Sequence, residues 1–297
     1  MWQQLIQQLQ QGNIKALART ISLVENEAKG YEEILANITT HPAKVIGITG
    51  PPGAGKSTLV DALTAEFIQA DKKVGILCVD PSSPFNLGAL LGDRVRMSEW
   101  YNHPRVYIRS LATRGSLGGL NPKIIEITEV MKAAAFDVVI VETVGVGQSE
   151  VEIAGLADTT VVVMVPEGGD EVQTMKAGLM EIADIFVVNK ADRPGADRFI
   201  KNLHQMLAPA FQKKQTEIPI LKTVALQKEG VHELYERIMA HDENQHLPVK
   251  KNWLLAERAY YLIQQKRMRG ITKKALLENI KKQDEKGFNL YRFVDNY

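Results

Sequence analysis

With 297 residues, of which 45% are hydrophobic and 24% charged, the chain can bury a full core without disulfides or a structural metal. The composition is that of an ordinary globular protein and excludes a disordered, collagen-like or coiled-coil chain. The 36 Lys and Arg against 35 Asp and Glu leave a net charge of +1, so no overall positive field attracts nucleic acid or an anionic membrane.

The N-terminal residues 2–39 are predicted to form helices. Apolar residues recur there at a spacing of three to four, which is typical of a buried helix face, and Gly12 with Asn13 interrupts the pattern. The apolar positions are Leu5, Ile6, Leu9, Ile14, Leu17, Ala18 and Ile21. We therefore expect residues 1–43 to form an N-terminal helical extension.

Two features of the chain favour the cytoplasm. The first residues lack the basic flank and apolar stretch of a signal peptide, and no run approaches the roughly 20 apolar residues that cross a bilayer. The single cysteine, Cys78, lies in an apolar run, where a buried thiol in a reducing compartment is expected. We therefore expect a cytoplasmic protein without a membrane segment.

Residues 44–241 alternate short apolar runs with helical stretches, the pattern of βαβ units in a parallel sheet. Strands are predicted at residues 45–49, 74–79, 106–108, 138–141, 160–165, 185–188 and 220–224. Apolar residues are consecutive in these runs, as expected for strands covered on both faces. Helices are predicted at residues 56–69, 124–135, 172–182, 197–207 and 231–239. We therefore expect an α/β domain with a mostly parallel central sheet flanked by helices.

Residues 242–297 are predicted to be a linker followed by a C-terminal helical arm. The polar stretch 242–250, which contains Pro248, has the composition of a linker. Apolar residues then line one helix face before and after a break at Gly270, namely Leu255, Ala259, Leu262, Leu276, Leu277 and Ile280. This stripe predicts a dimerisation arm, and the alternative is that these faces fold back on the sheet domain.

A phosphate-binding loop follows the first predicted strand. Gly50-Pro51-Pro52-Gly53-Ala54-Gly55-Lys56-Ser57 fits G-x-x-x-x-G-K-[ST] and lies between a strand and a helix, as that motif requires. In this motif backbone N–H groups face phosphate oxygens, the lysine reaches the β- and γ-phosphates, and the hydroxyl binds Mg²⁺. The residues expected at the phosphates are Gly50, Pro52, Gly53, Ala54, Gly55, Lys56, Ser57 and Thr58. The chain is therefore predicted to be a P-loop NTPase.

Asn189-Lys190-Ala191-Asp192 follows a later strand and predicts the base. A carboxylate at Asp192 can accept hydrogen bonds from both N1–H and the amino group of guanine, which adenine lacks. Asn189 is expected to brace neighbouring loops, and the aliphatic stem of Lys190 to cover a face of the base. Asn and Asp are also common turn residues after a strand. In a chain that holds a phosphate loop, the pattern indicates guanine.

Two predicted strands end in acids. Asp80 ends the run before Pro81, and Glu142 ends another run, so both carboxylates are expected beside Ser57 on one Mg²⁺. Asp93 is a third candidate acid. The alternatives are a turn-capping Asp80, a strand-end Glu142 satisfied by other contacts, and a solvated loop charge at Asp93. Gly145 permits close approach of the backbone to a γ-phosphate, as a switch loop would need.

These residues resemble the MeaB/ArgK-type P-loop GTPases, the family of the human methylmalonic aciduria type A protein. The resemblance extends over nearly the whole chain, and the run from Glu142 to Glu150 is its most specific part because a Glu replaces the usual strand-end Asp. Its motifs are Gly50-Pro51-Pro52-Gly53-Ala54-Gly55-Lys56-Ser57-Thr58, Asp80-Pro81-Ser82-Ser83, Leu91-Gly92-Asp93, Arg114-Gly115-Ser116-Leu117-Gly118-Gly119, Glu142-Thr143-Val144-Gly145-Val146-Gly147-Gln148-Ser149-Glu150 and Asn189-Lys190-Ala191-Asp192.

The resemblance implies a homodimeric G protein that attends an adenosylcobalamin-dependent acyl-CoA mutase, gating cofactor loading and protecting or reactivating the mutase. A cobalamin adenosyltransferase is a further implied partner. The family pattern would place Asp80, Asp93 and Glu142 around Mg²⁺, Ala225 at the base, and residues 166–176 in a switch that signals to the partner. Lys176 in that segment would approach the β- and γ-phosphates and stabilise developing charge.

The chain departs from the family pattern in two places. Residues 84–89 replace a Thr-, Gly- and Ser-rich stretch, and Thr223-Val224-Ala225 lacks the usual Ser before the Ala. Two other functions stay open: a metallochaperone GTPase and a P-loop kinase. The six scattered His and one Cys provide no metal store for the first, and no separate substrate motif indicates the second.

Overall fold

The computed structural model describes residues 2–80, 97–114, 120–145, 149–167, 182–214, 218–241, 248–283 and 288–297. The chain divides into two compact units, Met1–Leu247 and Pro248–Tyr297. The first contains the sheet and the second consists of helices, and each is described by itself.

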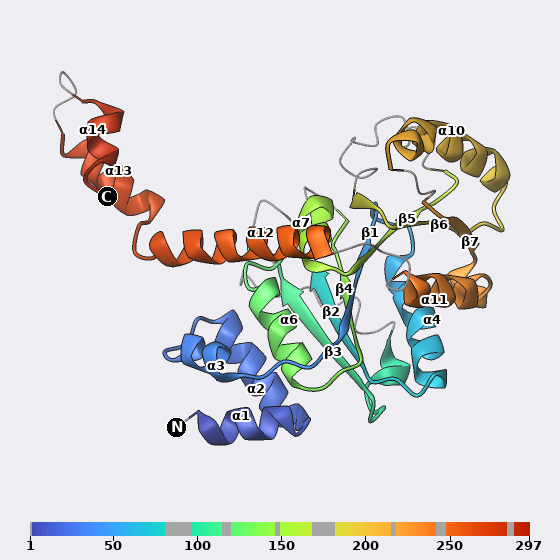
Figure 1. Cartoon of the computed structure of the whole chain (residues 1–297), viewed down its shortest axis with the longest axis horizontal. Coiled ribbons are helices and arrows are strands. Elements are labelled where there is room, and N and C mark those ends of the chain that lie inside the picture. The colour runs from blue at the N-terminus through green and yellow to red at the C-terminus, as the bar shows by residue number, and fades with distance from the viewer. Residues whose placement is uncertain are drawn as a thin grey trace. The chain divides into compact units, whose positions relative to one another are not determined.

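A seven-stranded, all-parallel sheet forms the centre of the first unit (Figure 1). The strands are β1 (Lys44–Thr49), β2 (Val74–Asp80), β3 (Val106–Ala112), β4 (Val138–Glu142), β5 (Thr159–Met164), β6 (Ile185–Asn189) and β7 (Ile220–Thr223), in the order β3-β2-β4-β1-β5-β6-β7. Each of the seven predicted strands is present, which confirms the α/β class. Because all strands are parallel, the loops after β1, β2, β4, β6 and β7 meet at one edge.

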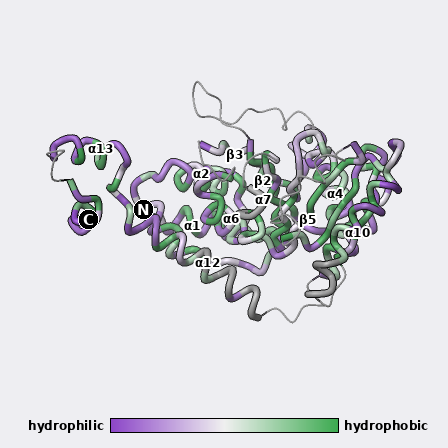
Figure 2. Tube along the Cα trace, turned by 90° about the horizontal axis from the view of Figure 1, so that it is seen from above, coloured by the Kyte–Doolittle hydropathy of each residue, from purple (hydrophilic) through white to green (hydrophobic). Residues whose placement is uncertain are grey.

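Helices cover both faces of the sheet. The helices of the first unit are α1 (Gln3–Gln10), α2 (Ile14–Glu25), α3 (Tyr31–Asn37), α4 (Lys56–Gln69), α6 (Ile124–Ala133), α7 (Ser149–Leu156), α10 (Ala196–Lys214) and α11 (Val231–Ala240), with short 3₁₀ turns at Ser98–Trp100 and Ala225–Gln227. Helices α4 and α11 share one hydrophobic cluster with the sheet, whereas α1–α3, α6 and α7 share the cluster on the other face. Figure 2 shows hydrophobic stretches gathered around the strands.

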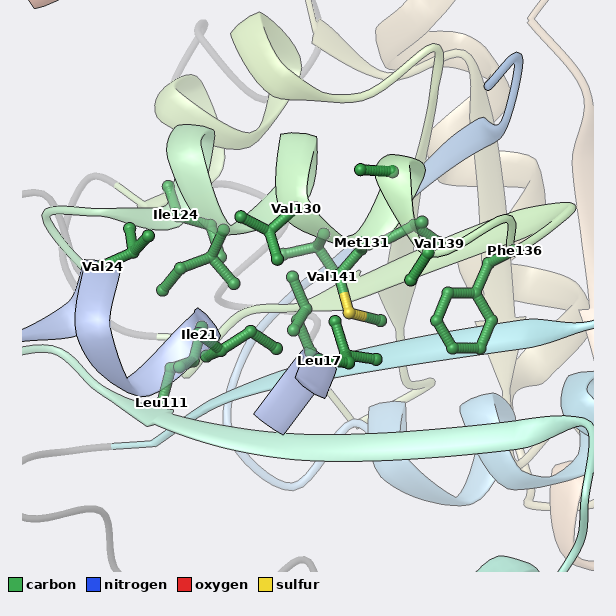
Figure 3. Close-up of a cluster of buried hydrophobic side chains, with 14 of the residues drawn as sticks. Leu17, Ile21, Val24, Leu111, Ile124, Val130, Met131, Phe136, Val139 and Val141 are labelled. Atoms are coloured by element: carbon green, nitrogen blue, oxygen red, sulfur yellow. The ribbon is translucent and has the colours of Figure 1, made fainter. Parts of the chain in front are cut away.

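The N-terminal helices are part of the core of this unit. Leu17 and Ile21 of α2 are fully buried and face Val130 and Met131 of α6 (Figure 3). Val141 of β4 lies in the same cluster. Burial of each such side chain is worth about 1.5–3 kcal/mol relative to water. The helices before the sheet are therefore held by hydrophobic contact with it.

Several element boundaries differ from the predictions. The N-terminal helices break a second time at Gly30, whose φ is +91° and where a Cβ would lie 2.5 Å from Nε1 of Trp2. Strand β3 runs on to Ala112, and α10 continues through Pro209. Helix α7 was not predicted, because it has only eight residues and its apolar residues lack helical periodicity. The predicted helix 172–182 lies outside the described residues, apart from residue 182.

The second unit consists of α12 (Pro248–Arg267), α13 (Lys273–Lys281) and α14 (Leu290–Val294). The prediction that the linker extends to residue 250 is wrong, since α12 begins at Pro248, and proline is well tolerated in the first turn of a helix. Thr272 caps α13 by accepting from Ala275 N at 3.1 Å. No helix in the described part of the chain is long and apolar enough to cross a membrane.

Candidate nucleotide-binding site

The loop between β1 and α4 has the backbone conformation of a phosphate cradle. Gly50, Gly53 and Gly55 have φ values of +139°, +77° and +86°, which residues with a side chain rarely adopt. A Cβ at Gly50 would collide with the carbonyl oxygen of Val163, and one at Gly55 would collide with Nδ2 of Asn189. Gly55 precedes α4 and has no side chain to cap it, so the helix N-terminus can face an anion.

Lys56 lies buried against this loop. Its Nζ donates to the carbonyl oxygens of Gly50 at 3.0 Å and Pro51 at 3.1 Å. Gly145, after β4, approaches the same place, because a Cβ there would lie 2.5 Å from Lys56 Nζ and would collide with Gly50 O. The loop after β4 therefore touches the phosphate loop through a residue that must be glycine.

Ser57 and Glu142 are in direct contact. Ser57 Oγ donates to Glu142 Oε1 at 2.7 Å, and both side chains are buried. Asp80 is also buried and ends β2, which lies beside β4, with Cys78 opposite Glu142. A hydroxyl and two carboxylates at one sheet edge are hard oxygen donors of the kind Mg²⁺ prefers.

Among the described residues, no three His, Cys, Asp or Glu side chains gather as a cation cluster. Mg²⁺ at nucleotide sites usually keeps several waters and binds one or two carboxylates together with phosphate oxygens.

Asn189 connects three loops of the site. Its Nδ2 donates to Ala54 O at 2.9 Å, and its Oδ1 accepts from Thr223 Oγ1 and from Ala225 N, both at 3.1 Å. The amide therefore uses both ends, joining the phosphate loop to the residues after β7. Because Asn189 is buried, these bonds are expensive to lose.

The side chain of Lys190 reaches from the loop after β6, here called the base loop because it holds Asn189-Lys190-Ala191-Asp192, to the phosphate loop. Lys190 has a left-handed backbone, with φ of +56°, and its Nζ donates to Gly53 O at 2.7 Å. Asp192 is exposed at the same loop. Its carboxylate is therefore accessible to a ligand.

The base loop also contacts the start of the segment after β5. Arg193 Nη1 lies 2.5 Å from Glu167 Oε1. The hydrogen bond from Arg193 lowers the pKa of the Glu167 carboxyl, and the backbone and the charge of Lys190 act in the same direction. Neither Arg193 nor Glu167 was singled out from the sequence, and no local motif marks a pair so far apart in the chain.

The remaining predicted residues divide into two groups. Pro52 is exposed on the phosphate loop, Thr58 is half-buried in the first turn of α4, and the N–H of Ala225 is bonded to Asn189. Asp93 and Lys176 lie outside the described residues, as do residues 84–89 and most of the segment 166–176.

The family model of the methylmalonyl-CoA mutase-associated GTPase MeaB matches residues 17–285. The chain belongs to the MeaB family. The GTPase ArgK of Escherichia coli is 36% identical over 244 residues, covering 79% of this chain and 74% of ArgK. A candidate GTPase of Pyrococcus horikoshii is 51% identical over 245 residues, covering 80% of this chain and 77% of that protein.

Two further matches connect the family to a mutase and to a solved fold. The fused isobutyryl-CoA mutase of Geobacillus kaustophilus is 39% identical over 239 residues, which cover 75% of this chain and 22% of the mutase. The crystal structure of an LAO/AO transport system kinase matches with a TM-score of 0.69 and 26% identity, covering 90% of this chain and 83% of that one. This MeaB-family protein is a P-loop GTPase that binds guanine nucleotides.

Proposed function

We propose that this MeaB-family GTPase is a chaperone of an adenosylcobalamin-dependent acyl-CoA mutase, and that it gates cofactor loading and protects or reactivates the mutase. The observation that carries the proposal is the fused isobutyryl-CoA mutase, in which a segment 39% identical to this chain lies in one polypeptide with a mutase. A separate protein of the same family would meet its mutase as a partner. A cobalamin adenosyltransferase is a second partner that we propose.

The phosphate loop would bind GTP through its backbone and Lys56. The glycine conformations turn N–H groups inward, and the N-terminus of α4 adds partial positive charge. Lys56 would exchange its bonds to Gly50 O and Pro51 O for the β- and γ-phosphate oxygens. The buried position makes that charge-assisted contact stronger than one at the surface.

Ser57, Asp80 and Glu142 would hold Mg²⁺, and Asp93 is a fourth proposed ligand. Bound Mg²⁺ neutralises charge on the β- and γ-phosphates during their separation. Glu142 accepts a hydrogen bond from the Ser57 hydroxyl, so the two side chains lie close enough to share one cation. Metal binding would then need only a turn of that hydroxyl.

Asp192 would select guanine by accepting from N1–H and the amino group, with the stem of Lys190 over the base. Asn189 would act by holding the phosphate loop and the residues at Ala225 in register. Ala225 stands beside the base in this proposal.

The switch is proposed to include Gly145 and residues 166–176. Gly145, in the loop after β4, lies against the phosphate loop, so its N–H would be placed to donate to a γ-phosphate. Hydrolysis would remove this acceptor and release the loop after β4. Glu167, at the start of residues 166–176, is joined to the base loop by its ion pair with Arg193. A bound mutase would hold this segment against the nucleotide and bring Lys176 to the phosphates.

The helices of the second unit are proposed to form the homodimer. Large apolar side chains are exposed along α12 to α14, as expected for a surface that another chain covers. The proposed compartment is the cytoplasm, where the single buried thiol of Cys78 would stay reduced.

GTP hydrolysis measured with and without a purified adenosylcobalamin-dependent acyl-CoA mutase from the same source tests the function. We expect stimulation by more than about tenfold, modest beside other activated G proteins, and co-purification that depends on the bound nucleotide. The Lys56→Ala variant is the control for contaminating activity. No stimulation and no complex with any such mutase would contradict the chaperone function, and transfer of phosphate to an acceptor other than water would favour a kinase.

A further inference from the structure

The last turn of α2 carries a carboxylate that holds one arginine of β3 and a second arginine just after that strand. Glu25 Oε2 lies 3.0 Å from Arg109 Nη2, and its Oε1 lies 3.3 Å from Arg114 Nη2. Only 10% of the Glu25 side chain is exposed, so solvent screens these pairs less than ordinary surface pairs. Ser22 accepts from Arg109 at 3.3 Å, and Asn26 accepts from Arg114 at 2.9 Å.

Arg114 has a backbone conformation that bulky residues rarely adopt. Its φ is +48°, in the left-handed region, which costs about 1–2 kcal/mol for a residue with a Cβ. Such a conformation persists where surrounding contacts hold it, and those contacts here come from Glu25 and Asn26. Residues strained in this way gather at functional sites.

Arg114 stands two residues beyond the end of β3, next to the end of β2. Ala112 pairs with Asp80 across the two strands, and Thr113 N donates to Asp80 O at 3.1 Å. Asn121 Nδ2 holds the same strand end by donating to Ala112 O at 2.7 Å. Thr113, the residue before Arg114, therefore bonds the main chain of a proposed Mg²⁺ ligand.

We propose that Glu25 and Arg114 are a positioning pair for the magnesium edge of the GTP site. Glu25 holds the Arg114 side chain, the left-handed backbone of Arg114 fixes Thr113, and Thr113 holds the main chain at Asp80. The N-terminal helices thereby belong to the GTP site, although they contribute no residue to the phosphate loop. This inference rests on the proposed role of Asp80 toward Mg²⁺.

A second ion pair provides the matched control. Glu27, two residues after Glu25, lies 2.8 Å from Lys123 Nζ, and the Tyr31 hydroxyl accepts from the same nitrogen at 3.3 Å. Burial lowers the pKa of Lys123, but Glu27, Glu126 and Tyr31 together outweigh it and raise the pKa. This pair also ties the N-terminal helices to the body, but its partners lie at α6 and α3 and not on β3.

Direct titration of Mg²⁺ into the full-length protein saturated with GDP, followed by calorimetry, tests the pair. Glu25→Gln removes the charge at nearly constant volume. Arg114→Gly removes the guanidinium while glycine keeps the left-handed backbone without strain. We expect both to weaken Mg²⁺ binding by about tenfold, the lower end of the loss seen when outer partners of a metal site are removed. Glu27→Gln should leave Mg²⁺ affinity unchanged while lowering the melting temperature.

Thermal unfolding of each variant separates positioning from folding, and Arg114→Gly alone decides the matter if Glu25→Gln does not fold. Wild-type Mg²⁺ affinity in Glu25→Gln and Arg114→Gly would overturn the inference. An equal loss in Glu27→Gln would also overturn it, because general loosening of the N-terminal helices would then explain the effect. A wild-type protein whose GDP complex binds no Mg²⁺ would instead contradict the proposed metal site itself.

Discussion

The two compact units place their apolar side chains in opposite ways. Among the described residues of Met1–Leu247, the exposed large hydrophobic side chains are Ile14, Tyr101 and Leu226. Those exposed in Pro248–Tyr297 are Tyr260, Tyr261, Ile263, Met268, Leu277, Phe288, Leu290, Tyr291, Val294 and Tyr297. Where burial is described in the second unit, Phe293 is the one buried hydrophobic side chain.

The units also differ in charge. Residues 248–297 contain twelve Lys and Arg against five Asp and Glu, which leaves twenty-four against thirty for residues 1–247. A sheet covered on both faces builds its own core, whereas the side chains of the second unit whose burial is described are mostly exposed. The comparison teaches that the first unit is stable through its own contacts, while the described part of the second unit leaves large apolar side chains exposed among basic residues.

The largest test of this difference is a pair of leucine truncations. Leu17→Ala opens a cavity between α2, α6 and the sheet and should lower the free energy of unfolding by about 2–5 kcal/mol. Leu277→Ala, in the exposed face of α13, should change it by less than about 0.5 kcal/mol at concentrations where the protein is monomeric. Urea unfolding measures both. Equal losses would mean that the second unit has a core of its own.

The second test concerns the nucleotide site of the first unit and asks whether Lys56 binds GTP. Lys56→Ala should lose about 1.5–3 kcal/mol of GTP binding, a factor of ten or more in affinity, because a buried charge-assisted contact is removed. Lys132→Ala, which breaks the pair with Glu129 on α6, is the control that changes charge by the same amount. Calorimetry measures the affinities. Unchanged GTP binding by folded Lys56→Ala protein would refute the assignment of this lysine.

A smaller effect is expected from an aspartate on the exposed face of the second unit. Ile263→Asp should weaken dimerisation by about tenfold, because a buried unpaired charge opposes association. Ile14→Asp places the same charge on an equally exposed isoleucine of α1 and should leave the dimer intact. Light scattering over a dilution series distinguishes them. A dimer lost only in Ile14→Asp would move the interface to the N-terminal helices.

The smallest effect concerns a contact within the first unit. The hydrogen bond from His232 Nδ1 to Glu66, 2.8 Å long, raises the pKa of His232 although the ring is exposed, and Glu236 adds to the shift. The stabilisation is complete below about pH 6.5 and is lost as pH rises through the raised value. His232→Gln should remove this part of the pH dependence of the melting temperature. Parallel curves for the variant and the wild type between pH 6 and 8 would show that the contact contributes nothing.

Much of the fold could be predicted because its signals are local. The seven strands follow from consecutive apolar residues, and α4 begins and ends where its sequence pattern predicts. The end of β3 was missed because pairing with β2 continues to Ala112, beyond the apolar run that marks the strand. The end of α10 was missed because the helix continues through Pro209. Helix α7 was missed because its eight residues do not separate into an apolar and a polar face.

In the nucleotide site, too, the local motifs could be predicted and the contacts between distant residues could not. Gly50 to Ser57 and Asn189 to Asp192 are recognisable in the sequence, since each motif places its chemistry within a few residues. The contacts from Asn189 to Ala54 and Ala225, and from Arg193 to Glu167, join residues far apart in the chain. No spacing rule predicts such pairs, because they depend on which loops the strand order brings together.

The sequence by itself determined the α/β class, the phosphate loop, the base motif and the two strand-end acids of this protein. Those features rest on local geometry, such as glycine conformations and strand periodicity. Only the tertiary structure decided that Ser57 bonds Glu142, that Gly145 touches the phosphate loop, and that Glu25 holds Arg114 beside Asp80. The strand order β3-β2-β4-β1 sets these contacts, because parallel pairing places the ends of β2 and β4 side by side next to β1.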